Sequence, residues 1–291
     1  MPFLLKLRTM KQKIKHILWC LLITLLVLIP VLPVAAEDTL LPKYDSQSNI
    51  ISKPGFILEY NENYEQASWV AYQLTSDETY GSFNRTDNYH EDNQVNNESA
   101  ELSDYRCSGY DRGHLAPAAD LAWSRDAMES SFALSNMSPQ KSSFNRGIWR
   151  KLELLVRAWA QEESSLYIVT GPVFRYGIVE RIGDNGVGVP KYYYKAVLDY
   201  TPPERKAIGF LLPHRESDRP LSSFAVTIDR IEEITGEDFF HTLPDSSENQ
   251  LESRFDTQRW NFNASVNEKG YRVESAAGAD SSYTQEQDKS E

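Results

Sequence analysis

One helical stretch followed by three strand-like runs is the feature of this 291-residue sequence that most limits its fold. Within residues 145–161 (NRGIWRKLELLVRAWAQ), apolar side chains recur at helical spacing on one face: Ile148, Leu152, Leu155, Val156 and Trp159. The runs SLYIVTGPVF, KYYYKAVLDY and KAIGFLLP follow it, and two of them are dense in aromatic and β-branched residues. The pattern predicts one amphipathic helix and then three strands.

Weaker patterns flank this region. Strand-like runs occupy residues 56–74, most clearly in SWVAYQLT (68–75). Residues 76–104 are rich in Asp, Asn, Glu and Ser without periodicity, which predicts a long loop, and such loops are usually functional. The stretch SSFAVTIDRIEEITG (222–236) predicts a second helix that ends at Gly236.

The N-terminal 36 residues form a separate segment. Five basic residues and no acidic one precede an uncharged apolar run from residue 17 to residue 36, which ends in Val34-Ala35-Ala36. This layout is typical of an export signal cleaved after Ala36. The alternative is an uncleaved anchor, because the run is long enough to span a bilayer. In either case we expect the rest of the chain to be exported, as a secreted or periplasmic protein or one anchored by residues 17–36.

The remaining chain reads as one domain. Residues 37–55 are polar, contain two prolines and predict an N-terminal arm, whereas residues 56–271 hold the strand and helix patterns. Residues 272–291 are polar and are expected to be disordered. Of the two cysteines, Cys20 lies in the export segment, so Cys107 has no partner in the processed chain and is expected to be a small buried side chain.

The charge of the processed chain argues against general affinity for polyanions. Without the five basic residues of the first segment, 25 Lys and Arg face 42 Asp and Glu, which gives a net charge of −17. Most of such a surface repels nucleic acid and anionic membranes. A polyanion site must therefore be a local basic cluster, for which the helix region offers five candidates: Lys141, Arg146, Arg150, Lys151 and Arg157.

The segment SGYDRGHLAPAAD (108–120) is the first candidate site. His114 is suited to accept a proton near neutral pH, and the forked donors of Arg112 suit phosphate oxygens. In an extended segment both would point to the same face, while Gly113 would let a ligand approach the backbone. Asp111 would point the other way, into a structural ion pair. The alternative interpretation is a surface turn that carries an Asp–Arg pair.

A second cluster begins at Ser135, in SNMSPQKSSFNRGIWRKLE. Its amide and carboxylate oxygens are hard ligands of the kind that Mg²⁺ accepts, and Mg²⁺ usually keeps several waters. Zinc is disfavoured because one cysteine remains after processing and the other histidines are scattered. The candidate ligands are Asn136, Gln140, Asn145 and Glu153.

Two of these residues lie eight positions apart on the predicted helix. Asn145 and Glu153 would be about 12 Å apart along its axis, so they cannot easily both touch one ion directly. Direct contact from Asn145, with Glu153 acting through water, fits this spacing better. The alternatives are a helix N-cap for Asn145 and a solvated surface carboxylate for Glu153.

Together the two clusters carry a family resemblance. YDRGHLAPAAD followed by FALSNMSPQKSSFNRGIWRKLE resembles the DNA/RNA non-specific endonucleases of the ββα-metal type. Further blocks are similar in the same order: WVAYQLT, LYIVTGPVF, VPKYYYKAVLD, AIGFLLP and EEITGEDFF. The likeness spans residues 56–255. It implies an α+β, ββα-metal nuclease fold with a central, mainly antiparallel sheet flanked by helices.

The resemblance also implies roles for individual residues. His114 matches the general base that activates water, Asn145 the protein ligand of the metal, and Glu153 a carboxylate that holds metal-bound waters. Arg112 matches an arginine beside the scissile phosphate. Supporting positions, structural or behind the metal ligand, are implied for Asp111, Asn136 and Gln140.

A second catalytic arginine is implied in the long loop before the motif. Arg85 is the candidate, with Arg106 as the alternative, and substrate contacts would come from Lys141, Arg146 and Arg150.

The implied function is one-metal hydrolysis of DNA and RNA to 5′-phosphate ends, with Mg²⁺ as the cofactor and Mn²⁺ or another divalent cation as the alternative. DNA and RNA are the implied partners. The oligomeric state stays open, with a homodimer as one option, and no stable membrane partner is implied once the signal is cleaved.

Two other functions compete with this one. The first is a metal-dependent phosphodiesterase for a smaller phosphate ester, which would need no basic track. The second is a non-catalytic binding protein on the same fold, which the acidic charge motivates.

Overall fold

A computed structural model describes residues 40–97 and 99–267 of the chain. The expected signal peptide or anchor (1–36) and the expected tail (272–291) lie outside the described residues. Within the described ranges, no helix is both long enough and apolar enough to cross a membrane.

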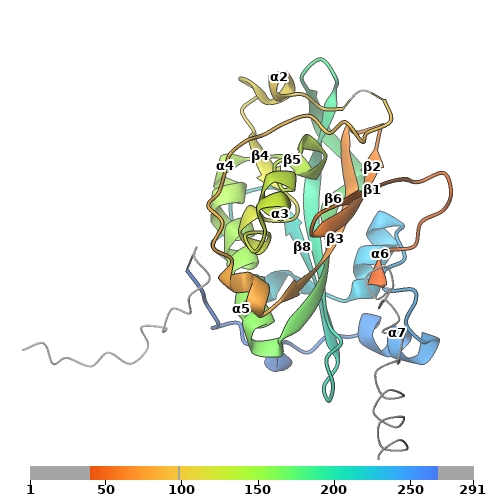
Figure 1. Cartoon of the computed structure of the whole chain (residues 1–291). Helices are drawn as coiled ribbons and strands as arrows, with labels where there is room; N and C mark the ends of the chain where they lie inside the picture. The colour runs from red at the N-terminus through yellow and green to blue at the C-terminus, as the bar shows by residue number, and fades with distance from the viewer. Residues whose placement is uncertain (1–39, 98, 268–291) are drawn as a thin grey trace, which may run out of the picture. The chain divides into compact units, whose positions relative to one another are not determined.

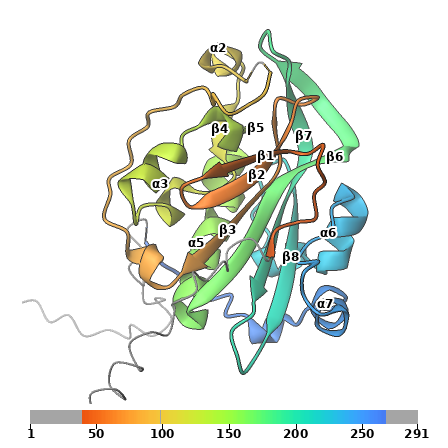
Figure 2. The ribbon, with the colours of Figure 1, turned by 45° about the vertical axis from the view of Figure 1, so that its right-hand side comes forward.

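A seven-stranded antiparallel sheet forms the centre of the described domain (Figures 1 and 2). Its strand order is β1-β2-β3-β6-β7-β8-β9. The bounds are Asn49–Lys53 for β1, Phe56–Asn61 for β2, Gln66–Thr75 for β3, Ser165–Ile182 for β6, Val187–Asp199 for β7, Lys206–Pro213 for β8 and Ala225–Val226 for β9. A separate two-stranded sheet pairs β4 (Asp111–His114) with β5 (Met137–Gln140).

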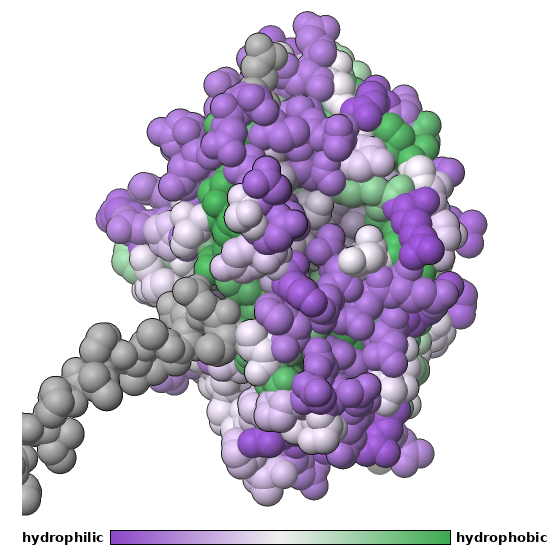
Figure 3. Space-filling view, turned by 90° about the vertical axis from the view of Figure 1, so that its right-hand side faces the viewer, coloured by the Kyte–Doolittle hydropathy of each residue, from purple (hydrophilic) through white to green (hydrophobic). Residues whose placement is uncertain are grey.

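Helices cover both faces of the large sheet (Figure 1). One face carries α5 (Arg150–Glu163), and the other carries α6 (Ile228–Thr235) and α7 (Asp245–Glu252). The molecular surface on the α6 and α7 side is hydrophilic over most of its area (Figure 3). The shorter helical segments are α2 (Leu102–Tyr105), α3 (Arg125–Ser130), α4 (Ser142–Phe144), η2 (Asp77–Tyr80), η3 (Ala118–Asp120), η4 (Leu134–Asn136), η6 (Leu221–Phe224) and η7 (Thr257–Arg259).

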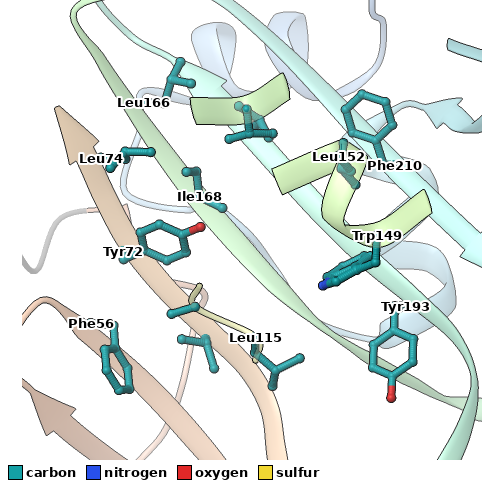
Figure 4. Packing of buried hydrophobic residues seen from close by; sticks show 14 of the residues in the cluster. Phe56, Tyr72, Leu74, Leu115, Trp149, Leu152, Leu166, Ile168, Tyr193 and Phe210 are labelled. Atoms are coloured by element: carbon teal, nitrogen blue, oxygen red, sulfur yellow. The ribbon is translucent and has the colours of Figure 1, made fainter. Parts of the chain in front are cut away.

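The core has one half on each side of the sheet. Trp149 and Leu152 pack with Ile168 and Phe210 on the α5 side (Figure 4). On the other side, Ile231 of α6 belongs to a second buried cluster with strand residues that point the opposite way. Because both faces of the central strands are covered, these strands read as nearly continuous apolar runs instead of the alternation of a half-exposed strand.

The predicted arm is wrong over its last part. Residues Asn49–Lys53 form β1, which pairs with β2 through a hairpin turn at Pro54-Gly55. Gly55 has φ +90°, a left-handed conformation that favours glycine. The proline that suggested an arm therefore belongs to the turn, so the folded domain begins before residue 56.

The predicted helices are present with different bounds. The regular helix α5 begins at Arg150, and a π-helical turn, η5 (Asn145–Trp149), leads into it. Gly147 inside this turn has φ −101° and ψ −112°, outside the helical region. The second helix, α6, begins after Thr227, whose side chain accepts a hydrogen bond from the backbone of Arg230, and it ends at Gly236 as predicted.

Two local expectations had different outcomes. The predicted long loop (76–104) is confirmed for residues 81–101, which have no regular helix or strand where the structure describes them, but both of its ends are helical: η2 occupies Asp77–Tyr80 and α2 begins at Leu102. The loop is held at His90, which forms an isolated bridge with Ala133. Cys107, expected to be buried, is exposed and lies in a turn after α2 with φ +58°.

Candidate active site

One continuous segment builds the candidate site from β4, β5 and the helix that follows them. The two strands pair so that His114 lies opposite Met137. Tyr193 of the large sheet holds β5 in place. Its hydroxyl group donates to the carbonyl oxygen of Pro139 at 2.8 Å and lies 2.7 Å from the Ser138 hydroxyl oxygen. The β4–β5 pair and the helix after it thus form a ββα unit anchored on the face of the sheet that α5 covers.

His114 is held as a neutral base. Its ring is buried against Phe132, edge to face, with 5.0 Å between the ring centroids. Its Nε2 atom makes no hydrogen bond to a described residue. Burial, followed by the charges of Arg85 and Arg112, lowers the pKa of His114 to about 3. The imidazole is therefore uncharged at neutral pH, and Nε2 is available to accept a proton.

Two arginines lie beside this histidine. The guanidinium group of Arg112 stacks on the ring of Tyr89 at 4.2 Å, and its buried Nε atom has no partner among the described residues. Arg85 donates to the Tyr89 hydroxyl oxygen at 3.0 Å, and its guanidinium group lies 4.9 Å from the centroid of Phe132. Tyr89 and Phe132 thus hold both cations next to His114.

The structure distinguishes the two candidates for the loop arginine. Arg85 is one of the two arginines whose charges act on His114. Arg106 is exposed and directly follows α2, and its charge is not among those that act on His114. The site therefore brings Arg85, and not Arg106, to the histidine.

Asp111 orients the side chain of Asn145. The Nδ2 atom of Asn145 donates to Oδ2 of Asp111 at 3.0 Å, which leaves its Oδ1 atom on the other side of the amide. Arg146 donates to both Asp111 oxygens at 3.0 and 3.1 Å, and Ser142 donates at 2.8 Å. Burial raises the pKa of Asp111, but the hydrogen bonds from Asn145, Arg146 and Ser142 more than offset this and lower the pKa below its usual value.

Glu153 is half-buried on α5, next to the buried charges of Asp120, Arg157 and Lys195. Burial raises its pKa, Lys195 and Arg157 oppose this rise, and the nearby Asp120 adds to it. Arg85 also acts on Glu153 and lowers its pKa, so the arginine that acts on His114 acts on this carboxylate as well. Glu153 therefore lies within electrostatic reach of the arginine that acts on His114, and its side chain is half-buried and not fully solvated.

Similarity to known proteins agrees with this geometry. A family model described as DNA/RNA non-specific endonuclease matches residues 38–246. The chain belongs to this family. It is 36% identical over 220 residues to a nuclease of Syncephalastrum racemosum, covering 67% of this chain and 68% of that one. It is 34% identical over 238 residues to the mitochondrial endonuclease G of Bos taurus, covering 72% of this chain and 80% of that one.

A solved structure supports the fold of this nuclease. The crystal structure of an EndoG/EndoGI complex, which concerns the mechanism of EndoG inhibition, aligns with a TM-score of 0.65 and 29% identity over 68% of this chain and 87% of that one. The resemblance seen in the sequence motifs, the ββα-metal α+β fold and the assignment as an enzyme are confirmed. The chain is a phosphodiester hydrolase, and the non-catalytic alternative is not supported.

The residues of the nuclease fit a hard cation that keeps most of its water. In the ββα unit that carries His114, the candidate oxygen ligands are Oδ1 of Asn145, on the side of the amide away from Asp111, and the carboxylate of Glu153. Among the described residues, the one group of three His, Cys, Asp or Glu side chains close enough to bind an ion together lies on α6 and α7, away from this site. A single protein ligand with a partly retained water shell suits Mg²⁺ and does not suit zinc.

The supporting residues Asn136 and Gln140 of the nuclease are buried. Asn136 is fully buried, and its amide group bonds to the backbone of Ala116 and Ser131, so its role is structural. Gln140 is also fully buried. The expected role of Gly113 is wrong: a Cβ atom there would lie 2.2 Å from Cδ of Gln140, so this glycine makes room for a side chain and not for a ligand.

The proposed basic cluster is smaller than expected. Arg157 is buried and pairs with Asp120 at 2.6 Å, so it contributes nothing to a surface track. Arg146 is exposed, but its guanidinium group is held by Asp111. Lys141, Arg150 and Lys151 are exposed on the helix side of the site.

Several residues of the site were not predicted from the sequence. Lys195 is fully buried on β7, where its Nζ atom has no hydrogen-bond partner among the described residues and lies 5.1 Å from the centroid of Trp149. Burial lowers its pKa, and Glu153 opposes this. A lysine inside an apolar strand is a usable signal, because fully buried lysines are rare unless they are paired. Tyr89 lies in a loop without periodicity and gave no such signal.

Proposed function

We propose that the chain is an exported, Mg²⁺-dependent endonuclease that hydrolyses DNA and RNA without sequence preference and leaves 5′-phosphate ends. The observation that carries this proposal is the buried Nε2 of His114, which is neutral and has no hydrogen-bond partner among the described residues; it lies next to Arg85 and Arg112 and on the same ββα unit as Asn145. Membership of the family supports nuclease activity, while the metal and export are part of the proposal.

His114 acts as the general base. Its lowered pKa keeps the imidazole neutral, so Nε2 can take a proton from the water that attacks phosphorus. The edge-to-face contact with Phe132 holds the ring in place, which limits the reorganisation needed at the moment of attack. A positively charged imidazole would be disfavoured beside two arginines until a phosphate enters the site.

Arg112 and Arg85 bind the phosphate group. Arg112 is held by its stacking on Tyr89, Arg85 is held by Tyr89, Phe132 and an exposed ion pair with Asp87, and the buried Nε–H of Arg112 is a donor without a partner among the described residues. A phosphate would satisfy that donor and offset the charges of both guanidinium groups. Because these groups bind before and during attack, they stabilise the negative charge that develops on the phosphoryl oxygens.

Asn145, through Oδ1, and Glu153, through water, are the residues that would hold the metal ion. When bound, Mg²⁺ supplies neutralisation of the charge on the phosphoryl group and on the leaving 3′ oxygen. The contribution of the chain is the orientation of the amide: Asp111 accepts from Nδ2 and so directs Oδ1 away from itself.

Low sequence selectivity follows from the kind of contact. The residues of the site contact the phosphate group and the metal, and such contacts carry little information on the base sequence. With a net charge of −17 after removal of residues 1–36, binding must depend on a few local cations and should weaken strongly with salt. Lys141 and Arg150 are the proposed contacts at the helix side, with Arg146 engaged mainly in orienting Asp111.

A cleavage assay tests the proposal. Residues 37–291 are incubated with supercoiled plasmid and with RNA, in Mg²⁺, in Mn²⁺ or in chelator, and the product ends are labelled with a kinase before and after phosphatase treatment. We expect metal-dependent cleavage of both polymers and labelling only after phosphatase. Cleavage in chelator, or direct labelling, would contradict the proposal. Hydrolysis of a small phosphodiester without cleavage of either polymer would select the smaller-ester alternative.

Export is tested separately by the intact mass of the protein recovered outside the cytoplasm. We expect a chain that begins at Glu37. A chain that keeps residues 17–36 and stays with the membrane fraction would support the anchored alternative, and a full-length cytoplasmic chain would contradict export.

A further inference from the structure

Three carboxylates meet on the face of the sheet that lies opposite the active site. Asp229 and Glu232 lie on α6 and Glu252 is the last residue of α7, and one oxygen from each lies within 4.8 Å of the others. These helices belong to the core half opposite α5 (Figure 1), on the hydrophilic face of the molecule (Figure 3). The group therefore shares no residue with the active site.

Glu252 is the unusual member of this group. Its side chain is 5% exposed, and its Oε1 atom has no hydrogen-bond partner among the described residues. A buried carboxylate without a partner is unfavourable by several kcal/mol unless it is neutralised. The position therefore calls for a cation or for a bound proton.

Within the part of the chain that the structure describes, the charges that act on Glu252 include no cation. Burial, followed by Glu232, Glu248, Asp229 and Asp238, raises its pKa to about 9. All four of these groups are acidic.

The cations of the neighbourhood act on other acids. Lys43 pairs with Asp238 at 3.2 Å, where both side chains are largely exposed. The charges of Lys43 and His241 act on Glu248, whereas neither is among the charges that act on Glu252.

We propose that Asp229, Glu232 and Glu252 form a binding site for a hard divalent cation, best matched by Ca²⁺, that joins α6 to α7. Carboxylate oxygens are the ligands that Ca²⁺ prefers, at about 2.3–2.6 Å. Oxygens that lie within 4.8 Å of one another can be bridged by one such ion with little movement. The Oε1 atom of Glu232 already accepts a hydrogen bond from the backbone of Phe239 at 2.7 Å, which orients its carboxylate.

The competing explanation is that Glu252 simply binds a proton. The two explanations differ in their response to metal, and Glu252→Gln separates them because glutamine keeps the shape of a protonated glutamate but removes an anionic ligand. Glu248→Gln is the matched control. It removes the same charge from the same helix but lies outside the group of three.

The test is thermal unfolding of the purified chain in chelator, in Ca²⁺ and in Mg²⁺. At a Ca²⁺ concentration about 100 times the Kd, we expect the Tm of the wild type and of Glu248→Gln to rise by roughly 5–10 °C. We expect no rise for Glu252→Gln, whose Tm in chelator should equal or exceed that of the wild type. A wild type that does not respond to Ca²⁺, or a Glu252→Gln variant that responds equally, would overturn the proposal.

Binding at the active site is separated by Asn145→Ala. The Ca²⁺ response of this variant should match that of the wild type, because the proposed site shares no residue with the catalytic one. A response lost in Asn145→Ala and kept in Glu252→Gln would assign the ion to the active site and overturn the proposal. Because the readout is stability, the outcome is independent of whether the chain cleaves nucleic acid.

Discussion

Asn145 donates a hydrogen bond from its Nδ2 atom to Oδ2 of Asp111 at 3.0 Å. This bond joins the first residue of the Asp-Arg-Gly-His motif, on β4, to the proposed metal ligand, which lies in the helical region after β5. An amide group offers a cation only its oxygen, so an acceptor on the nitrogen side decides which way the group faces. In the proposed site Asp111 would therefore act on the metal through Asn145, and Arg146 and Ser142 hold Asp111 in turn.

Asp111→Asn should weaken metal binding. The variant loses the charged acceptor of Asn145 Nδ2, and the loss of a group that orients a metal ligand typically lowers metal affinity 10- to 100-fold. We expect the Mg²⁺ concentration for half-maximal plasmid nicking to rise by that factor, with much of the maximal rate recovered at high Mg²⁺. Ser142→Ala, which removes one of the donors to Asp111, should change it by less than about tenfold. An unchanged Mg²⁺ requirement in Asp111→Asn would contradict the role given to this bond.

The acid limb of the pH profile should depend on Arg85. In the proposed mechanism the neutral form of His114 is the active one, and its pKa is lowered first by burial and then by Arg85 and Arg112. Activity should therefore persist below pH 6.5. Arg85→Gln removes a positive charge, raises the pKa of His114 and should move the acid limb of kcat/KM to higher pH. Arg106→Gln is the control and should leave the limb in place. A limb that moves to lower pH in Arg85→Gln would exclude this electrostatic coupling.

His214 should make the fold sensitive to acid. Its Nδ1–H group donates to the carbonyl oxygen of Pro190 at 2.9 Å, and its Nε2 accepts from the backbone N–H of Lys141 at 2.7 Å. A second proton, on Nε2 of His214, would break the bond to Lys141, the residue that directly precedes α4. Burial is the main cause that lowers the pKa of His214 to about 4.

The sign of this effect follows from the two pKa values. The folded-state value of His214 lies below the ordinary 6.5, so its stabilising contribution is complete above pH 6.5 and is lost as the pH falls through 4. This difference in pKa corresponds to at most about 3–4 kcal/mol in the free energy of unfolding. Urea titrations at pH 7, 5.5 and 4 should show a smaller pH dependence for His214→Phe than for the wild type. Equal dependence in both proteins would remove His214 as a cause.

The buried ion pair below the site should be needed for folding. Asp120 accepts from Arg157 at 2.6 Å and from the Tyr72 hydroxyl group at 2.9 Å, and both charged side chains are almost fully buried. Asp120→Asn removes the carboxylate that is hydrogen-bonded to Arg157, and breaking a buried pair typically destabilises by about 3–5 kcal/mol. Denaturant unfolding measures this loss. Glu233→Gln, which breaks an exposed pair with Arg230, should leave the unfolding midpoint unchanged, and equal effects of the two variants would contradict the prediction.

The site was predictable where it follows the order of the chain. His114, Arg112 and Asn145 lie on one continuous ββα unit, so residues that are close in sequence also meet in space. Lys195 comes from β7, and only the register of the sheet brings it beneath Trp149. A linear pattern does not contain that register.

The errors in the fold have local physical causes. Pro54 suggested an arm, yet a proline followed by a glycine with positive φ forms the turn of a hairpin. The apolar stripe of the helix predicted at residues 145–161 continues through its first turn, so hydrophobic periodicity alone does not reveal the π-helical turn η5, which contains Gly147. Arg157 was assigned to the surface because of its charge. It is instead buried in an ion pair with Asp120, which lies far away in the sequence.

The rate of plasmid nicking by His114→Ala, measured in saturating Mg²⁺ beside a denaturant titration of the same protein, tests the central claim most directly. Loss of the general base should lower kcat by about 10²- to 10⁴-fold while the variant stays folded, because its Nε2 atom makes no hydrogen bond to a described residue. A folded variant that nicks the plasmid at the rate of the wild type would show that His114 is not the base.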